Sequence, residues 1–490
     1  MKTECNSWFR RDGLALLTDF YELTMMAGHW KDSRTDQYVS FDYFFRALPQ
    51  NTGYAVAAGL DDFLRYLEHL RFAEDDLDYL RSLNLFDEAF LDYLRGFKPH
   101  CTVRAVPEGT LVFPHEPVIQ VEGPILEAQL VETALLNMVN YQTLIATKAA
   151  RVCLAADGDT VMEFGLRRAH GPDGGVSASR AAYIGGCTST SNVLAGKVHG
   201  IPVAGTHAHS WVMSFSSELE AFRAFARLYP ERCVLLVDTY DTVKSGIPNA
   251  VQVFCEMRDQ GLAVRPAVRL DSGDLAKLSK ICYSMMVQAG LEEPLIVASN
   301  DLNEDLIADL KRQGARINGW GVGTQLITAY DAPALPGVYK LVALLQDGTW
   351  QPRLKITSNP EKATDPGRKR LVRYYGAEGQ PLGDILYLEE EETWPEGGSI
   401  EGRAQKHPHV VRRLENVASA QELLQTVFQD GRRTIMPPGT NAIRDTMLAH
   451  QRRIPDEYKR LRNPEIYKVL LSHRLGEMKD KMLFKPEGAL

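Results

Sequence analysis

The spacing of hydrophobic positions changes along the chain and predicts regions of different architecture. Residues 14–30 carry Leu, Phe, Met and Trp at helical spacing behind Thr18 or Asp19, each a candidate N-cap, and predict a helix near the start. From 38 to 125, strand-like runs such as YVSFDYFF alternate with helical patterns such as LDDFLRYLEHL and with turn signals. This mixture predicts a compact α+β domain. A pattern without Gly or Pro over 127–156 predicts one long amphipathic helix.

A different pattern repeats from residue 160 to about residue 345. Short β-branched runs begin at 160, 201, 233, 267, 294 and 317, and they end in polar or glycine residues before helical patterns such as AVQVFCEMRDQG. Their starts lie 23 to 41 residues apart, which fits repeated βα units with right-handed crossovers. The repeat favours a (β/α) barrel, with an open doubly wound sheet as the alternative.

The expected fold class is therefore α/β with an α+β N-terminal domain. We expect that domain over 1–126, an irregular (β/α) barrel over 127–350 that begins with the long helix, and a basic loop with a helical C-terminal extension over 351–490. Within the last region, residues 352–373 are basic and rich in turn residues. They predict either a loop that faces phosphate or a solvated surface loop.

Composition narrows the class of protein. A net charge of −8 over 490 residues argues against a dedicated nucleic-acid-binding protein, whose surface would carry a basic excess. The seven cysteines form no CxxC pair and suggest neither a zinc site nor a disulfide framework. The N-terminus has no apolar signal segment, and no run of about 18 apolar residues occurs. We expect a cytoplasmic protein without a membrane or nucleic-acid partner.

Polar residues stand where the expected strands end, which is where barrels carry their chemistry. These positions are Thr206, Asp238, Asp271, Asn300 and Thr324. In RLDSGDL, Arg269 and Asp271 alternate to one face of a strand, so the arginine could bind a carboxylate while the aspartate binds ribose hydroxyls or Mg²⁺. An internal salt bridge is the alternative. The DTYDT motif at Asp238 offers a second carboxylate pair with the same ambiguity.

Glycines indicate a phosphate site. GVGT at 321–324 ends an expected strand, and glycines let backbone N–H groups approach a phosphate closely. A simple tight turn is the alternative. The segment 163–215 adds two adjacent arginines, Arg167 and Arg168, and nine glycines. The chain has no GxxxxGK[ST] motif, so any use of ATP does not depend on a P-loop.

His207 and His209 form an HxH pair that would face one side of a strand and could indicate a metal-dependent barrel hydrolase. Such a site needs ligands from later strands, yet no histidine occurs between 210 and 406. Acid–base catalysis or transient phosphorylation of one histidine fits better, and a structural histidine stays open. On sequence alone, the aromatic residues Tyr21 and Phe164 are better explained as core residues than as ligand contacts.

The motifs TDFYELTMM, EFGLRRAHGPDG, GTHAHS, DTYDT, RLDSGDL, GVGT and KITSNPEKATDPGRK, in this order, closely resemble the nicotinate phosphoribosyltransferase family. The resemblance runs from about residue 12 to residue 480. It implies a type II phosphoribosyltransferase fold with an N-terminal α+β domain, an irregular (β/α) barrel and C-terminal extensions. The implied reaction joins nicotinate to 5-phosphoribosyl-1-diphosphate, giving nicotinate mononucleotide and diphosphate. The resemblance further implies ATP as a co-substrate through a phosphohistidine, Mg²⁺ as the cofactor, and a homodimer with shared active sites.

The resemblance also implies a role for each matched residue. His209 matches the phosphorylated histidine. Tyr21, supplied by the neighbouring subunit, and Phe164 match the aromatics on either side of the pyridine ring. The remaining matches are Thr206 and Arg269 to nicotinate contacts, Arg167 and Ser210 to the same pocket, Asp238 and Asp271 to ribose and Mg²⁺, and Gly321, Gly323 and Thr324 to the 5′-phosphate cradle. Lys355, Lys362 and Lys369 resemble residues that reach ATP, although their spacing is loose.

Three alternatives accompany this interpretation. One is a nicotinamide or quinolinate phosphoribosyltransferase of the same fold, which the GPDGG and GTHAHS motifs disfavour. The second is the metal-dependent barrel hydrolase built on the HxH pair. The third is a non-catalytic nucleotide-binding regulator, which is disfavoured because two carboxylate clusters and a reactive histidine exceed what binding needs.

Overall fold

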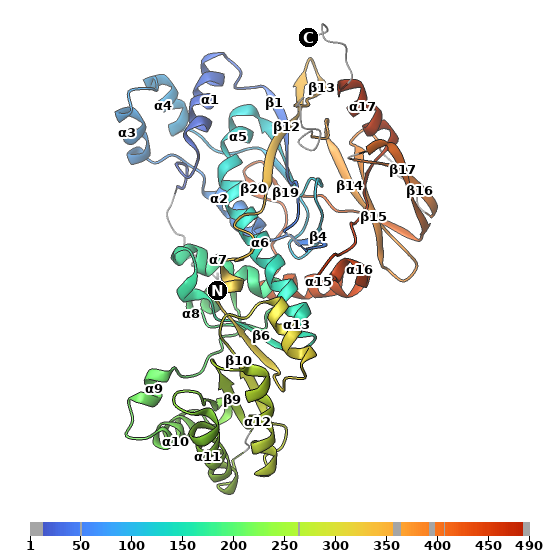
Figure 1. The fold of residues 1–490 in the computed structure, drawn as a ribbon. Helices are drawn as coiled ribbons and strands as arrows, with labels where there is room; N and C mark the ends of the chain where they lie inside the picture. Colours follow the sequence, from blue (N-terminus) through green and yellow to red (C-terminus); the bar gives the residue numbers. More distant parts are fainter. Residues whose placement is uncertain are drawn as a thin grey trace. The chain divides into compact units, whose positions relative to one another are not determined.

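The computed structural model describes residues 13–49, 51–262, 265–355, 364–391, 397–405 and 407–483 (Figure 1). The chain forms two compact units. Among the described residues, one unit consists of 145–333, and the other combines 13–144 with those after 333. Among the described helices, none is long and apolar enough to cross a membrane.

The first unit, which we call the barrel unit, is built on a parallel sheet. Its strand order is β7-β6-β11-β10-β9-β8, and every pair is parallel. No hydrogen-bonded pair in the described residues joins β7 to β8, so the barrel is irregular, and the expected α/β class is confirmed. The strands are β6 (Thr160–Glu163), β7 (Ser189–Thr190), β8 (Val234–Leu236), β9 (Ala267–Leu270), β10 (Leu295–Ala298) and β11 (Gly319–Val322).

Helices alternate with these strands. Several begin with a polar side chain that accepts a backbone N–H of the first turn, as Asp274 does from Lys277 and Asn303 from Leu306. Such caps let the chain leave a strand and enter a helix within a few residues. The helices are α7 (Gly171–Ile184), α8 (Val193–His199), α9 (His209–Met213), α10 (Glu218–Leu228), α11 (Ile247–Asp259), α12 (Leu275–Gln288), α13 (Glu304–Arg312) and α14 (Thr324–Ile327).

Two sequence expectations for this unit are wrong. The run at 201–206 makes only an isolated bridge between Thr190 and Val203, and the two-residue strand β7 takes the expected place beside β6. Pro202 has no N–H to donate to a ladder, which explains the weak pairing. The long helix is also divided. Val131 ends α5 (Ile125–Leu130), and α6 (Glu132–Ala156) begins directly after it.

The second unit, which we call the flanking unit, contains two large sheets. Their orders are β13-β12-β1-β5-β3-β19-β20 and β17-β16-β21-β15-β14-β18. Before residue 145 it contains α1 (Phe20–Lys31), β1 (Tyr38–Phe45), β2 (Ala55–Val56), α2 (Leu60–His69), α3 (Glu74–Ser82), α4 (Glu88–Arg95), β3 (Thr102–Ala105), β4 (Leu111–Val112), β5 (Ile119–Pro124) and α5. Strand β1 is buried along almost its whole length because it pairs on both edges.

The C-terminal segment is not the helical extension expected from its polar composition. It contributes all six strands of the second sheet of the flanking unit, and among its described residues only α15 to α17 are helical. The pairs β14–β15 and β16–β17 are local, but the sheet is completed by partners distant in sequence, such as β21 beside β15 and β16, which a local pattern does not reveal. The elements are β12 (Gly337–Gln346), β13 (Thr349–Pro352), β14 (Lys369–Tyr375), β15 (Pro381–Leu388), β16 (Gly398–Ala404), β17 (His407–Val417), β18 (Ser419–Glu422), β19 (Gln425–Gln429), β20 (Arg432–Arg433), α15 (Thr440–Arg453), α16 (Asp456–Lys459), β21 (Val469–Leu471) and α17 (His473–Leu483).

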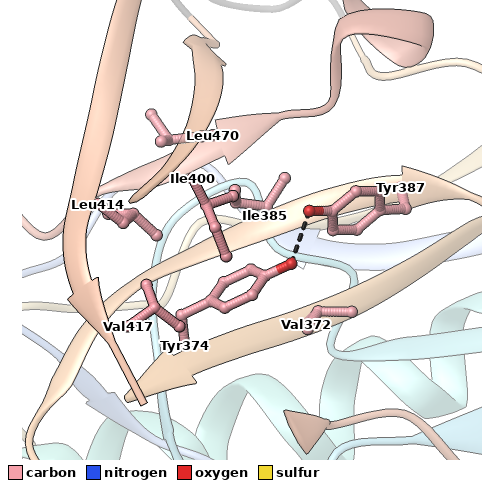
Figure 2. Close-up of a cluster of buried hydrophobic side chains, with 8 residues drawn as sticks. All are labelled: Val372, Tyr374, Ile385, Tyr387, Ile400, Leu414, Val417 and Leu470. Carbon is pink, nitrogen blue, oxygen red and sulfur yellow. Dashed lines mark hydrogen bonds between the residues drawn. The ribbon is translucent and has the colours of Figure 1, made fainter. Parts of the chain in front are cut away.

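A hydrophobic cluster holds this second sheet together. Figure 2 shows side chains from β14, β15, β16, β17 and β21 that meet on one side of the sheet. Within the cluster, the Tyr374 and Tyr387 hydroxyls lie 2.6 Å apart and form a hydrogen bond, which satisfies two polar groups that burial has removed from water. The members are Val372, Tyr374, Ile385, Tyr387, Ile400, Leu414, Val417 and Leu470.

A buried ion pair lies on the same sheet. The Arg373 guanidinium donates to both carboxylate oxygens of Asp384, with Nη2 2.7 Å from Oδ2. The Tyr467 hydroxyl donates to the same carboxylate at 2.9 Å. Glu116 is also fully buried beside them, and its Oε2 accepts the Phe113 N–H. Burial and the Asp384 carboxylate raise the pKa of Glu116 well above its usual value, so we expect Glu116 to be protonated in the folded protein.

Glu116 therefore makes stability depend on pH. Because folding raises its pKa, the folded state holds a proton that the unfolded state releases above about pH 4.3, and stability falls as the pH rises towards the folded pKa. Glu116→Gln stays neutral and should remove this fall, which amounts to at most about 1.4 kcal/mol per pH unit. We expect its unfolding midpoint, relative to the parent, to rise between pH 5 and pH 8. Glu378→Gln, at an exposed turn, is the control. If the difference in unfolding midpoint between Glu116→Gln and the parent is the same at pH 5 and at pH 8, Glu116 is not protonated in the folded protein.

Candidate active site

The parallel sheet of the barrel unit brings the carboxyl ends of its strands to one edge. Because all six strands run in the same direction, residues that follow them in sequence gather there. The site is therefore assembled from short segments that lie far apart in the chain. These residues are Phe164 after β6, Ser191 after β7, Asp238 after β8, Asp271 after β9, Ser299 after β10 and Gly323 after β11.

Two carboxylates meet at this edge. Asp238 Oδ2 accepts the Asp271 N–H and the Ser272 hydroxyl, both at 2.7 Å. Its other oxygen, Oδ1, is buried and has no hydrogen-bond partner among the described residues. Asp271 accepts from the Ser299 hydroxyl. One oxygen of Asp238 thus fixes the geometry, while the other stays available to a ligand hydroxyl or a cation.

Arg269 lies beside the carboxylates and is mostly buried. Its Nη1 donates to the Thr206 hydroxyl at 3.5 Å, and its Nε is buried without a partner in the described part of the chain. Burial lowers the pKa of Arg269, as does Arg167, while Asp271 and Asp238 oppose that shift. Within the described residues no ion pair joins Arg269 to a carboxylate, so the internal salt bridge considered above does not form. A buried guanidinium with unused donors is suited to an anionic ligand.

The two histidines of the HxH pair have different environments. They do not share a strand, because His209 begins α9 and His207 lies in the preceding loop. His207 is buried, and its Nε2 accepts the Leu236 N–H at 3.2 Å. That N–H belongs to β8, an edge strand of the described sheet, and points away from β9. Burial lowers the pKa of His207 to about 4, so its imidazole is neutral at physiological pH.

His209 is accessible and faces the carboxylates. Its side chain is 37% exposed, with Nδ1 3.1 Å from the Thr239 hydroxyl and Nε2 3.9 Å from Asp271 Oδ2. If Nδ1 carries the proton and donates to Thr239, Nε2 keeps its lone pair and remains free to act as a nucleophile. In the described residues, no group of three or more His, Cys, Asp or Glu side chains is arranged to hold a metal ion. His207 and His209 do not converge, which removes the basis of the hydrolase alternative.

Phe164 and the glycines of GVGT pack against each other. The Phe164 N–H donates to the Val322 carbonyl at 2.8 Å, which extends the pairing of β6 with β11. A Cβ at Gly321 would lie 2.6 Å from the Phe164 ring, so only glycine leaves room for it. Arg167 follows in a short 3₁₀ turn (Leu166–Arg168), where it and Arg168 are exposed. The ring and Arg167 thus lie on one turn after β6.

Ser210, Thr324 and Tyr21 are among the predicted residues that no described side-chain hydrogen bond joins to this cluster. Ser210 is exposed on α9, and Thr324 begins α14 after Gly323. Tyr21 belongs to the flanking unit, where it lies on α1 with 47% of its surface exposed. Burial, Glu132 and Glu22 raise the pKa of Tyr21 above its usual value, so its hydroxyl stays protonated.

The lysines of the basic loop have different environments. Lys355 is exposed at the end of a described segment, and Lys362 lies outside the described residues. Lys369 is buried at the start of β14, and its Nζ lies 2.8 Å from Asp42 Oδ2. The same Nζ donates to the carbonyls of Asp365 and Gly367. Lys369 therefore holds the flanking unit together and has no donor left for a nucleotide.

The sequence analysis missed several supporting residues. Thr239, Ser272 and Ser299 orient the charged side chains, although each stands within or next to a motif that drew attention for another residue. Their position at the ends of expected strands is the feature of the sequence that could have identified them as site residues. Glu163 was also missed as a functional residue, because a carboxylate inside the strand segment EFG gives no local sign of what it binds.

Comparison with known proteins shows the family of this chain. The model of the nicotinate phosphoribosyltransferase N-terminal domain matches residues 16–140, and that of the C-terminal domain matches residues 368–479. The nicotinate phosphoribosyltransferase of Bacillus subtilis (strain 168) is 44% identical over 95% of this chain and 94% of its own length. The human nicotinate phosphoribosyltransferase is 38% identical over 94% of this chain and 95% of its own length.

Solved structures show the same fold. The crystal structure of human nicotinic acid phosphoribosyltransferase matches 95% of this chain and 99% of its own, with a TM-score of 0.83 at 35% identity. A nicotinate-nucleotide pyrophosphorylase from Pyrococcus furiosus matches with a TM-score of 0.68 at 23% identity, which shows the fold alone. The two family models, the relatives that match over most of both chains and the shared fold show that this chain belongs to the nicotinate phosphoribosyltransferase family.

Proposed function

We propose that this chain transfers the phosphoribosyl group of 5-phosphoribosyl-1-diphosphate to nicotinate, giving nicotinate mononucleotide and diphosphate in NAD salvage. The observation that carries the proposal is Arg269, a buried guanidinium with an unpartnered Nε beside Thr206. Nicotinate has one carboxylate, and a guanidinium binds a carboxylate through paired N–H donors. The relatives from Bacillus subtilis and human match this chain over almost its whole length and are named nicotinate phosphoribosyltransferases, which supports nicotinate as the substrate.

In the proposed binding mode, nicotinate and 5-phosphoribosyl-1-diphosphate occupy two neighbouring parts of the edge where the strands end. Phe164 stacks on the pyridine ring while Arg269 and Thr206 bind its carboxylate, and Ser210 lines the same pocket. Asp238 and Asp271 accept hydrogen bonds from ribose hydroxyls, because Asp238 Oδ1 has no partner in the described residues. Arg167 binds the diphosphate, and backbone groups of Gly321, Gly323 and Thr324 hold the 5′-phosphate.

The chemistry then needs positioning more than a general base. The pyridine nitrogen attacks the anomeric carbon as the bond to diphosphate breaks, and the electron pair leaves with diphosphate. Positive charge develops on the sugar ring, and the nearby carboxylates of Asp238 and Asp271 stabilise it. Arg167 stabilises the charge on the leaving group.

The carboxylates also fit a magnesium ion. Mg²⁺ in phosphate enzymes is commonly held by one or two protein carboxylates, with phosphate and water oxygens as the other ligands. Asp238 and Asp271 would hold it, and the ion would neutralise charge on the departing diphosphate when bound.

We assign the coupling to ATP to His209. Its Nε2 would attack the γ-phosphorus of ATP, so that the N–P bond forms as the bond to ADP breaks, and water would later release the phosphate. Thr239 supports the assignment because it orients the ring through Nδ1. Phosphorylation adds about −1.5 to −2 charge at this position, beside the carboxylates. His207 is unsuited to the role because Nε2 is engaged by a backbone N–H.

The second aromatic of the ring site is Tyr21. It lies in the flanking unit and is half exposed, which supports its use by a second copy of the chain in a homodimer. We therefore propose a dimer with shared active sites.

A product assay tests the proposed function. The purified enzyme is incubated with 5-phosphoribosyl-1-diphosphate, Mg²⁺ and either nicotinate, nicotinamide or quinolinate, with and without ATP. We expect a mononucleotide from nicotinate alone, at a higher yield with ATP, because Arg269 supplies one carboxylate site. Formation of product from nicotinamide but not from nicotinate would overturn the substrate assignment.

His209→Ala separates the ATP step from phosphoribosyl transfer. We expect the variant to lose ATP hydrolysis while it retains weak synthesis without ATP, because the pyridine nitrogen does not need the imidazole to attack. Steady-state phosphate release and mononucleotide formation measure the two activities. His473→Ala, at an exposed histidine of the flanking unit, is the matched control. ATP hydrolysis at the parent rate in His209→Ala would refute the phosphohistidine.

Arg269→Ala tests carboxylate recognition. A hydrogen bond to a charged group contributes about 1.5–3 kcal/mol, so its loss should raise the KM for nicotinate roughly 10- to 100-fold. The KM for ATP should change little. Arg312→Ala removes an exposed arginine of the same unit and is the control. A KM for nicotinate within twofold of the parent value would remove Arg269 from the nicotinate site.

A further inference from the structure

Glu163 is a buried carboxylate at the carboxyl end of β6. It has no solvent-exposed surface, and three neutral groups of the barrel unit donate to it. Its Oε2 accepts the Thr190 hydroxyl at 2.6 Å and the Ser179 hydroxyl at 2.9 Å. Its Oε1 accepts the backbone N–H of Gly165. The carboxylate therefore connects β7 and α7 to the turn that follows its own strand.

This arrangement is costly for a residue that serves only the core. Burial of a carboxylate costs several kcal/mol unless the charge is both hydrogen-bonded and paired with a cation. Glu163 has the hydrogen bonds, but none of the described ion pairs includes it. An apolar side chain would fill the same strand position without that cost. The cost suggests that a carboxylate here serves the geometry of the turn that follows.

That turn carries the proposed nicotinate site. The Gly165 N–H that Glu163 binds lies directly between Phe164 and the 3₁₀ turn of Arg167. Ile327 packs closely against Gly165, because a Cβ at this position would lie 2.5 Å from the Ile327 side chain. Glu163 and Ile327 thus both contact the turn. The direction of the Phe164 ring and the start of the Arg167 turn both follow from where Gly165 is fixed.

We propose that Glu163 is a positioning residue, whose buried carboxylate fixes the Gly165 amide and so aligns Phe164 for nicotinate and Arg167 for diphosphate. The proposal rests on the proposed function for the ligand, while the alignment of the turn is independent of it. Glu163 acts through Phe164 and does not touch the substrate. Ser179 and Thr190 are its supports, since their hydroxyls hold the carboxylate in place.

Two substitutions at Glu163 test the proposal. Glu163→Ala removes the acceptor, and we expect the KM for nicotinate to rise about tenfold while the KM for ATP stays within twofold. Glu163→Gln retains one oxygen for Gly165, and the hydroxyls can turn to accept its amide, so it should recover most of the loss. If Glu163→Ala does not fold, Ser179→Ala combined with Thr190→Val removes the two supports instead, and the same rise is expected.

Asp159→Ala is the matched control. Asp159 stands just before the opposite end of β6, where its carboxylate accepts from the Trp320 indole and from Lys311. Its loss should lower the unfolding midpoint without changing the KM for nicotinate. A rise in that KM comparable to the rise in Glu163→Ala would show that any damage to β6 has this effect and would overturn the proposal.

Amide hydrogen exchange provides a second measurement that needs no substrate. We expect faster exchange in the peptide covering 164–168 in Glu163→Ala, and parent-like exchange there in Asp159→Ala. Parent-like exchange in Glu163→Ala would overturn the proposal. A parent enzyme that forms no nicotinate mononucleotide would instead refute the proposed function, and the exchange result would still decide whether Glu163 fixes the turn.

Discussion

The parallel pairing of the six strands in the barrel unit is the constraint on which the site depends. Since β6 to β11 run in one direction, each strand delivers its last residues to the same edge. Asp238 and Asp271 lie 33 positions apart in sequence, yet the side chain of one accepts the backbone N–H of the other. Without the pairing of β8 with β9, neither carboxylate would have a defined position.

Burial at that edge explains why the charged groups remain available to ligands. Arg269 and Asp238 each form hydrogen bonds with neighbouring residues. Each also has one buried atom without a partner among the described residues. Such atoms are destabilising in the absence of a ligand, because water no longer compensates them. The fold tolerates the cost because the rest of the sheet is apolar and closely packed. The same reasoning distinguishes Lys369, whose donors are all used inside the flanking unit.

Sequence reasoning identified the elements whose signals are local. The strands β6, β8, β9, β10 and β11 follow from β-branched runs that end in polar residues, and their end positions identified Asp238 and Asp271 as candidate site residues. Phe164 was assigned to the site only through the family resemblance. The two-residue β7 is too short to show a pattern. The C-terminal strands were not found because their sheet is completed by pairs between distant segments, such as β14 with β18 and β15 with β21. Glu163 was missed for the same reason: its function depends on Ser179, Thr190 and Gly165, which only the fold brings together.

The hydrogen bond between His207 and the edge strand β8 affects how the site responds to pH. An imidazole buried against Phe225 and engaged by the Leu236 N–H remains uncharged far below neutral pH. Because burial holds the pKa of His207 at about 4, its ring stays neutral between pH 5 and pH 8. The charge that His207 contributes beside Arg269 is therefore constant over the pH range in which most enzyme assays are run.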